Sequence, residues 1–253
     1  MNKTNKQQRS ALRIISEGAT IVISILLAFG IDAWWSTKQV NDSQGRLLTG
    51  LLQESRVNER KLDNMISFRR ASLETTTTLQ QAAAERNSTI TSDSLDHLLV
   101  NVTGNYFPMY EHGALDEFYL GGGASLLQNE SLRGIIGAYR RSLEVAEVFD
   151  VTDLQFQNVT WTPFLRLNAN LPQITNAQTD IPGVNMERYA ADVPVLQKLD
   201  HTVLLSSQEF VNLLLEMKWV HEDALNYYPT FQQNSTKLIS ALEAELGIKQ
   251  EEN

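Results

Sequence analysis

The feature that most constrains this chain is an uncharged apolar run near its N-terminus. No charged residue occurs in 18–31, and the run closes on Asp32, Trp34 and Trp35. As a helix, residues 19–35 rise about 26 Å at 1.5 Å per residue, close to the ~30 Å hydrocarbon core of a bilayer. Paired indoles also fit the interfacial belt of a membrane. The run therefore predicts a membrane-spanning helix, and the lipid bilayer is the first partner that we expect for this chain.

The charges on either side of this run predict its orientation. Four basic residues precede the first acid, Glu17, whereas only Lys38 and Arg46 follow closely behind; the four are Lys3, Lys6, Arg9 and Arg13. Positive charge is retained on the cytoplasmic side of membranes. We therefore expect a cytoplasmic N-terminus and an extracytoplasmic remainder, with the carboxylate of Asp32 solvated at the outer interface rather than acting inside the membrane.

Two other interpretations of the run stay open. A basic start, an apolar stretch and the small residues Ala28 and Gly30 also resemble a cleaved signal peptide, and a buried helix of a soluble domain is a third possibility. A retained anchor is favoured because helix-forming sequence continues beyond the run without proline to about residue 86. Its apolar residues recur at helical spacing: Leu47, Leu48, Leu51, Leu52, Leu62, Met65, Ile66 and Leu73.

The remainder of the sequence predicts helices and no strands. Short helices are expected over residues 93–100 and 114–120, a long one from an Asn129 N-cap to 167 with a bend near Pro163, and a last one from 206 to 247. The predicted fold class is all-α, with one transmembrane helix and an extracytoplasmic antiparallel helical bundle. The predicted divisions are a basic tail (1–16), the anchor (17–35), the helical domain (36–247) and an acidic tail (248–253).

Composition excludes several classes of function. The chain has 21 basic and 30 acidic residues, a net charge of −9, and no cysteine. An acidic domain is a poor ligand for phosphate backbones, so we expect no nucleic-acid partner. The lack of cysteine excludes disulfides, thiolate metal sites and a cysteine nucleophile.

No motif predicts a catalytic, metal or cofactor site. The triplet at 121–123 lacks the lysine of a phosphate-binding loop and predicts a turn between helices, and Asp116 with Glu117 is interpreted as a solvated face. The four histidines, which are His97, His112, His201 and His221, show no paired-ligand spacing. We therefore expect no catalytic residue, no bound metal and no cofactor.

One aromatic cluster stands out in the sequence. It comprises Tyr106, Phe107, Tyr110, Phe118 and Tyr119. Core packing around the short helices is the first interpretation, and a groove for a ligand or partner is the alternative.

Two stretches resemble a widespread group of uncharacterised bacterial single-pass membrane proteins. In the first, a basic tail leads into an apolar helix that opens at Glu17 and closes on Asp32, Trp34 and Trp35. The second and weaker likeness comprises Phe118-Tyr119, Gly121 to Gly123, Leu126-Leu127, Asn129 to Arg133, and Tyr139. The resemblance covers about a quarter of the chain. It implies a bacterial origin and an inner-membrane location, and it implies no activity. With the orientation predicted above, the helical domain would then be periplasmic.

These observations together predict a membrane-anchored interaction or structural module that acts through a protein partner or self-association. The alternative is a small-ligand sensor. Its 16-residue cytoplasmic tail has no room for an output domain, so such a sensor would have to signal through a membrane partner. An enzyme of unknown type is the third interpretation.

Overall fold

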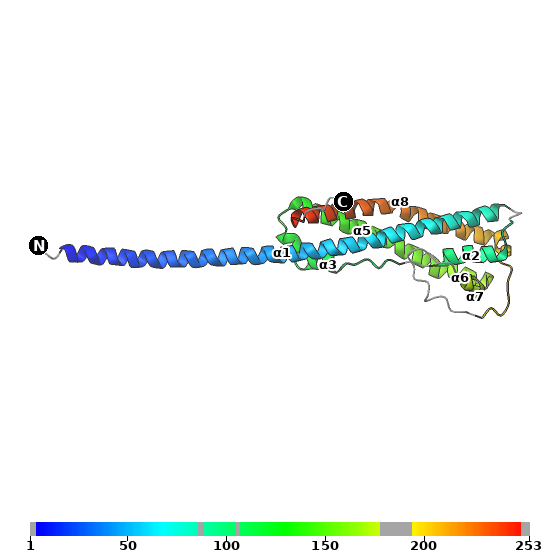
Figure 1. Cartoon of the computed structure of the whole chain (residues 1–253), viewed down its shortest axis with the longest axis horizontal. Coiled ribbons are helices and arrows are strands. Elements are labelled where there is room, and N and C mark those ends of the chain that lie inside the picture. Colours follow the sequence, from blue (N-terminus) through cyan, green and yellow to red (C-terminus); the bar gives the residue numbers. More distant parts are fainter. Residues whose placement is uncertain (1–3, 86–88, 105–106, 178–193, 249–253) are drawn as a thin grey trace.

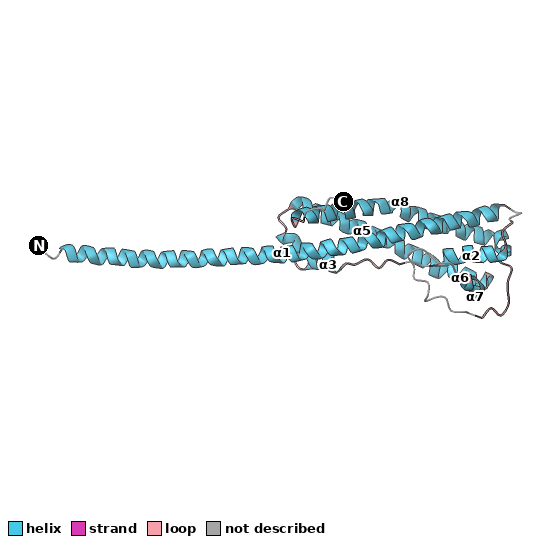
Figure 2. Ribbon diagram, in the orientation of Figure 1, coloured by secondary structure: helices cyan, strands magenta, loops and turns pink. Residues whose placement is uncertain are grey.

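The computed structural model describes residues 4–85, 89–104, 107–177 and 194–248, with the side chains of its first helix from Ile23 onward. Every regular element in these residues is helical, which confirms the all-α class (Figure 2). The longest element is α1 (Thr4–Ala84), whose N-terminal half projects alone beyond the other helices (Figure 1).

No helix with described side chains is both long enough and apolar enough to cross a membrane. The predicted anchor, residues 17–35, begins before those side chains, so its residues 17–22 lie outside the part of the chain to which this finding applies.

The C-terminal half of α1 packs against α5 (Glu130–Phe156) and α8 (Gln208–Glu245). Helix α8 runs antiparallel to α1, since Arg56 pairs with Glu243 at 2.7 Å whereas Arg69, farther along α1, contacts His221. The prediction of a long C-terminal helix is confirmed, and Pro229 lies inside it.

Helices α1 and α5 run parallel, which departs from the predicted antiparallel bundle. Asn58 meets Tyr139 and Arg69 meets Asp150, so residue numbers rise together in the two helices. The reason lies in the connection. After α2 (Ser92–Thr103) the chain returns along the bundle in an extended segment, so α5 starts again at the end from which α1 projects (Figure 1).

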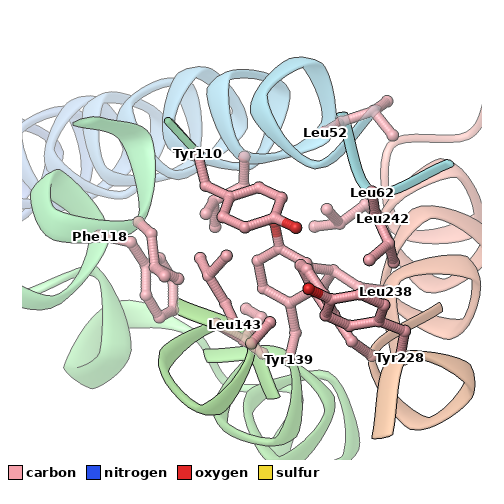
Figure 3. Packing of buried hydrophobic residues seen from close by; sticks show 14 of the residues in the cluster. Leu52, Leu62, Tyr110, Phe118, Tyr139, Leu143, Tyr228, Leu238 and Leu242 are labelled. Atoms are coloured by element: carbon pink, nitrogen blue, oxygen red, sulfur yellow. The ribbon is translucent and has the colours of Figure 1, made fainter. Parts of the chain in front are cut away.

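Two apolar clusters fill the bundle. The first lies at the end from which α1 projects and includes Leu52, Tyr139 and Leu242 (Figure 3). The second lies at the far end, where Trp161, Phe164 and Phe210 stack with ring centroids about 6 Å apart. Each fully buried large apolar side chain contributes about 1.5–3 kcal/mol to stability relative to an exposed one. The two clusters therefore hold the three long helices together.

Several helix boundaries follow from caps that the sequence displays. Asn129 caps α5 through its side chain, as predicted, by accepting a hydrogen bond from the Leu132 N–H. The cap of α8 is Ser207 rather than the predicted Ser206, because the Ser207 hydroxyl accepts from the Phe210 N–H. The helix expected over 93–100 begins at Ser92, and its N-cap is Thr91, whose hydroxyl accepts from the Ser94 N–H.

The predicted bend near Pro163 takes the form of a widened helical turn. Helix α5 passes into a π-helix, η1 (Gln157–Trp161), and then into α6 (Thr162–Asn168), where Pro163 occupies the first turn. Proline has no N–H for the helical ladder, and a π turn is one local rearrangement that accommodates such a break.

Short helices complete the molecule. Helix α3 (Gly113–Leu120) confirms a prediction, whereas α4 (Gly123–Leu126), α7 (Leu171–Asn176) and the 3-10 helix η3 (His201–Ser206) were not predicted. The three prolines of residues 168–194, which are Pro172, Pro182 and Pro194, predict an irregular crossover, but α7 forms within it. Residues 178–193 of this segment lie outside the described part of the chain.

Candidate functional site

The most strongly polar site inside the bundle centres on Arg69 of α1. Its fully buried guanidinium lies 3.1 Å from Asp150 Oδ1 and 3.0 Å from Asp153 Oδ2, both on α5. Arg69 also donates to Tyr228 Oη at 3.2 Å and to His221 Nδ1 at 3.2 Å, both on α8. This set, which we call the Arg69 cluster, joins all three long helices.

Burial and mutual charge set the protonation of the Arg69 cluster. Burial raises the pKa of Asp150 and of Asp153, although the Arg69 charge opposes the rise. Burial alone would lower the pKa of Arg69, but the facing acidic groups, Asp153 foremost, raise it above its ordinary value. The guanidinium is therefore charged and faces more acidic groups than it can neutralise.

His221 is the neutral member of the Arg69 cluster. Burial, with a smaller effect of Arg69, lowers its pKa to about 3. Because Nδ1 accepts from Arg69, the ring proton is on Nε2, and this atom has no hydrogen-bond partner among the described residues. Asp150 Oδ2 and Asp153 Oδ1 are likewise unpartnered within that part of the chain.

The chemistry that the Arg69 cluster supports is structural. Tyr228 donates to Asp150 Oδ1 at 2.5 Å, and burial raises its pKa. The phenol therefore stays protonated and is no nucleophile. A buried ion pair of this kind specifies how helices align more than it stabilises them, because desolvation offsets most of the attraction. No group of three or more potential ligand side chains in the described residues could hold a metal ion.

A second polar cluster lies at the far end of the bundle. His201 contacts Asp96 through Nδ1, and its Nε2 accepts a hydrogen bond from the Asn170 N–H at 2.9 Å. Gln173 donates to the other Asp96 oxygen at 2.7 Å and accepts from the Leu199 N–H at 2.9 Å. These bonds attach α7 and η3 to α2.

A third feature is an open groove of about 670 Å³ between α5, η1 and α8. Its lining is largely apolar: Val148, Phe149, Phe156 and Val159 on one side, and Trp219 and Val220 on the other. Glu216 and Asp223 are its charged members. We refer to this feature as the α5/α8 groove.

The predicted membrane-interface residues lie on the projecting part of α1. Asp32, Trp34 and Trp35 are all exposed there. The two indole rings are 6.3 Å apart, and Lys38 Nζ lies 5.7 Å from the centre of the Trp34 ring.

The predicted aromatic cluster is divided between core and surface. Tyr110 and Phe118 are buried in the first apolar cluster (Figure 3). Tyr110 packs edge-on against Phe231. Tyr119 is partly buried under the guanidinium of Arg140, at 4.6 Å, and Phe107 is exposed. Tyr106 lies outside the described residues. Packing is thus the role of Tyr110 and Phe118.

The remaining sequence candidates take ordinary structural places. Gly121 and Gly122 form the turn between α3 and α4, with Gly122 at φ 78°, and Gly123 begins α4. Asp116 and Glu117 are exposed. His112 pairs with Glu147 at 2.6 Å, and His97 is exposed.

Sequence reasoning did not identify the Arg69 cluster, although a signal for it exists. Arg69 follows Leu62 and Met65, Asp150 and Asp153 follow Leu143 and Ala146, and His221 follows Leu214 and Met217, each in steps of three and four residues. A charged or polar residue in phase with the apolar stripe of its own helix predicts a buried polar contact.

Comparison with known proteins gave no match to any family model, curated protein or solved structure.

Proposed function

We propose that this chain is a single-pass membrane protein whose helical bundle acts through protein contacts and not through catalysis. In this proposal residues 17–35 of α1 span the inner membrane of a bacterium, the N-terminus is cytoplasmic, and the bundle lies in the periplasm.

The observation that carries the proposal is the apolar surface of the projecting part of α1. Ile23, Leu27 and Phe29 are 57%, 61% and 68% exposed, and no other described element covers them. Leaving such side chains in water forgoes about 1.5–3 kcal/mol each. A bilayer would cover this surface all around the helix, which a single partner helix could not do.

The flanks of this segment support the same arrangement. Asp32, the two tryptophans and Lys38 follow the apolar residues, in the order expected where a helix leaves the hydrocarbon for the headgroups. From Trp35 to Leu47, where contacts with the bundle begin, the helix rises about 18 Å. The bundle would therefore stand away from the membrane on a helical stalk.

Interaction, rather than chemistry, is favoured by the interior of the bundle. Its buried ionisable groups bind other groups of the chain: the Arg69 cluster joins α1, α5 and α8, and Asp96 pairs with His201 at the far end. Among the described residues, the surfaces open to other molecules include the stalk, the α5/α8 groove, and a hollow of about 700 Å³ between the end of α1, η3 and the start of α8.

The proposal is tested by isolating the full-length chain from membranes and identifying bound proteins by mass spectrometry. The matched variant carries Asp32→Leu and Trp34→Ala, which alter the interface without touching the bundle. We expect a partner in stoichiometric amount with the unaltered chain and its loss or reduction with the variant. Recovery of the chain in the soluble fraction, or of no partner with either form, would contradict the proposal.

A further inference from the structure

We propose that the α5/α8 groove binds a basic amphipathic helix of a partner protein. This inference rests on the proposed function, in which the bundle acts through protein contacts, and it names both the surface and the chemistry of what binds there.

The groove exposes more apolar surface than packing within the chain requires. Val148, Val159 and Trp219 are 62%, 74% and 55% exposed, although all three face the same hollow. Scattered single apolar residues are ordinary on protein surfaces, but a contiguous set with a large aromatic side chain is typical of contact sites.

The path of the chain explains why this surface stays open. At the π turn, Gln157 donates to Val102 O at 3.1 Å and Trp161 donates to Thr103 Oγ1 at 3.1 Å, so both side chains turn toward α2. Beyond Phe156 the inward side chains are therefore shared between α2 and the start of α8, where Trp161 and Phe164 stack on Phe210. Val159, which lies between Gln157 and Trp161, faces outward into the groove that Trp219 also lines. Widened turns of this kind occur often at functional sites.

The Arg69 cluster lies directly behind this surface. Phe149 and Asp223 line the groove, whereas their neighbours Asp150, Asp153 and His221 contact Arg69 inside the bundle. The Phe149 carbonyl also accepts from Arg69 at 3.4 Å. The ion pairs of Arg69 with α5 and the hydrogen bonds to Tyr228 and His221 on α8 thus fix α5 and α8 at the spacing that forms the groove. A preformed site loses little conformational entropy when it binds.

Charge distinguishes among the possible occupants. Glu216 and Asp223 line the groove, and no basic residue does so among the described residues. A second copy docked groove to groove would bring four carboxylates together, and an anionic lipid surface would also be repelled. A helix with an apolar face flanked by Lys or Arg is complementary to this site.

The dimensions fit a short helix. Residues 148–160 along one side of the groove rise about 18 Å, the length of a helix of about 12 residues. This is long enough for an i, i+3, i+4, i+7 set of anchoring side chains, which spans about 10.5 Å.

A photo-crosslinking experiment on the full-length chain tests the inference. The chain is placed in phosphatidylcholine vesicles with p-benzoylphenylalanine in place of Val159, or in place of Leu120, an exposed apolar residue of α3 outside the groove. The probes are two biotinylated peptides of about 14 residues with the same leucine stripe, one with Lys and one with Glu at all polar positions. The crosslinked products are identified by mass spectrometry.

We expect the Lys peptide to crosslink at position 159 well above position 120, and the Glu peptide at neither. Glu216→Gln with Asp223→Asn should weaken half-maximal crosslinking about fivefold, since each removes one attractive charge at the rim. Glu74→Gln with Glu209→Gln removes the same charge elsewhere and should leave it unchanged.

Three outcomes would overturn the inference. They are equal crosslinking of the Lys and Glu peptides, equal crosslinking at both positions, and crosslinks from position 159 to lipid or to a second copy of the chain in place of the peptide. Flotation of the same vesicles reports separately on the membrane anchor. A chain that fails to float but still crosslinks the Lys peptide would contradict the proposed anchor and leave the groove assignment intact.

Discussion

Arg69 shows how one residue can determine the alignment of three helices. Its guanidinium is fully buried, and it contacts Asp150 and Asp153 on α5 and His221 and Tyr228 on α8. Removing one side of a buried ion pair is far more damaging than never having had the pair, because the remaining charges stay in a medium of low polarity. The Arg69 cluster therefore acts as a register device between α1, α5 and α8.

Replacement of the buried arginine should strongly destabilise the bundle. We expect Arg69→Ala to lower the free energy of unfolding by about 3–5 kcal/mol, because it leaves two buried carboxylates without a cation. Arg70→Ala, at the exposed neighbouring position, should change it by less than about 0.5 kcal/mol. Urea unfolding of the full-length chain in detergent, followed by circular dichroism, measures both. Equal losses in the two variants would contradict a pairing role for Arg69.

His221 should make stability depend on pH in the acid range. Its pKa is about 3 in the folded chain, chiefly through burial, and about 6.5 when unfolded. Between pH 6.5 and 3 the His221 side chain therefore binds a proton in the unfolded chain but not in the folded chain. The stability due to neutral His221 is complete above about pH 6.5 and is lost as pH falls toward 3. Asp150 and Asp153 act in the opposite sense, since their raised pKa favours proton uptake by the folded chain at low pH.

The variant His221→Gln isolates this effect because glutamine can accept a hydrogen bond from Arg69 without titrating. The stability difference between the unaltered chain and this variant should be flat above about pH 6.5. Between pH 6.5 and 4.5 the unaltered chain should lose more stability, by up to about 1.4 kcal/mol per pH unit. Parallel curves in urea titrations at each pH would show that His221 is not the group responsible.

At the scale of elements, long helices were predictable and their mutual arrangement was not. In α5 the apolar residues Leu132, Ile136, Tyr139 and Leu143 recur at the 3.6-residue period of a helix, and all four are buried. Such a period can be recognised directly in a sequence. The parallel course of α1 and α5 depends on the extended return segment before α3, whose path is set by tertiary contacts. One of these tertiary contacts is made by Asn58 of α1, whose side chain accepts a hydrogen bond from the N–H of Glu111 in the return segment at 2.7 Å.

The candidate sites also divide into those that sequence reasoning predicted and those that depend on the tertiary arrangement. The exposure of Asp32, Trp34 and Trp35 agrees with their position in an apolar run, whereas the Arg69 cluster joins residues up to 159 positions apart. The α5/α8 groove depends on the π turn, and hydrophobic periodicity does not distinguish a π turn from a continued α-helix.

The α3–α4 turn offers a matched test with two glycines. A Cβ on Gly123 would lie 2.8 Å from Phe118 Cδ2 and 2.9 Å from Phe118 O, whereas a Cβ on Gly134 in α5 would meet nothing within 4 Å. Gly123→Ala should therefore cost about 1–3 kcal/mol through overpacking. Gly134→Ala should stabilise by about 0.5–1 kcal/mol, since alanine is the better helix former. Thermal unfolding of the two variants measures the difference, and shifts of the same sign would contradict this account of the turn.

At the scale of the whole molecule, α1 combines two roles in one helix. Its C-terminal half is a member of the bundle, and its N-terminal half projects with exposed apolar residues (Figure 1). Because the helix is continuous, it would hold the bundle and its α5/α8 groove at a fixed distance from the proposed membrane. A partner with its own membrane helix and a basic amphipathic segment could contact both parts at once, which raises the effective concentration of the second contact.

The most direct test of the membrane anchor is the accessibility of single cysteines on either side of it. The natural chain has no cysteine, so Ser10→Cys and Asn41→Cys each introduce one thiol, before and after the apolar run. Spheroplasts that express either variant are treated with a membrane-impermeant maleimide, before and after lysis. The account predicts labelling of the Asn41→Cys chain in intact spheroplasts and of the Ser10→Cys chain only after lysis. Labelling of both or of neither before lysis, or recovery of the chain outside the membrane fraction, would contradict a single span with a cytoplasmic N-terminus.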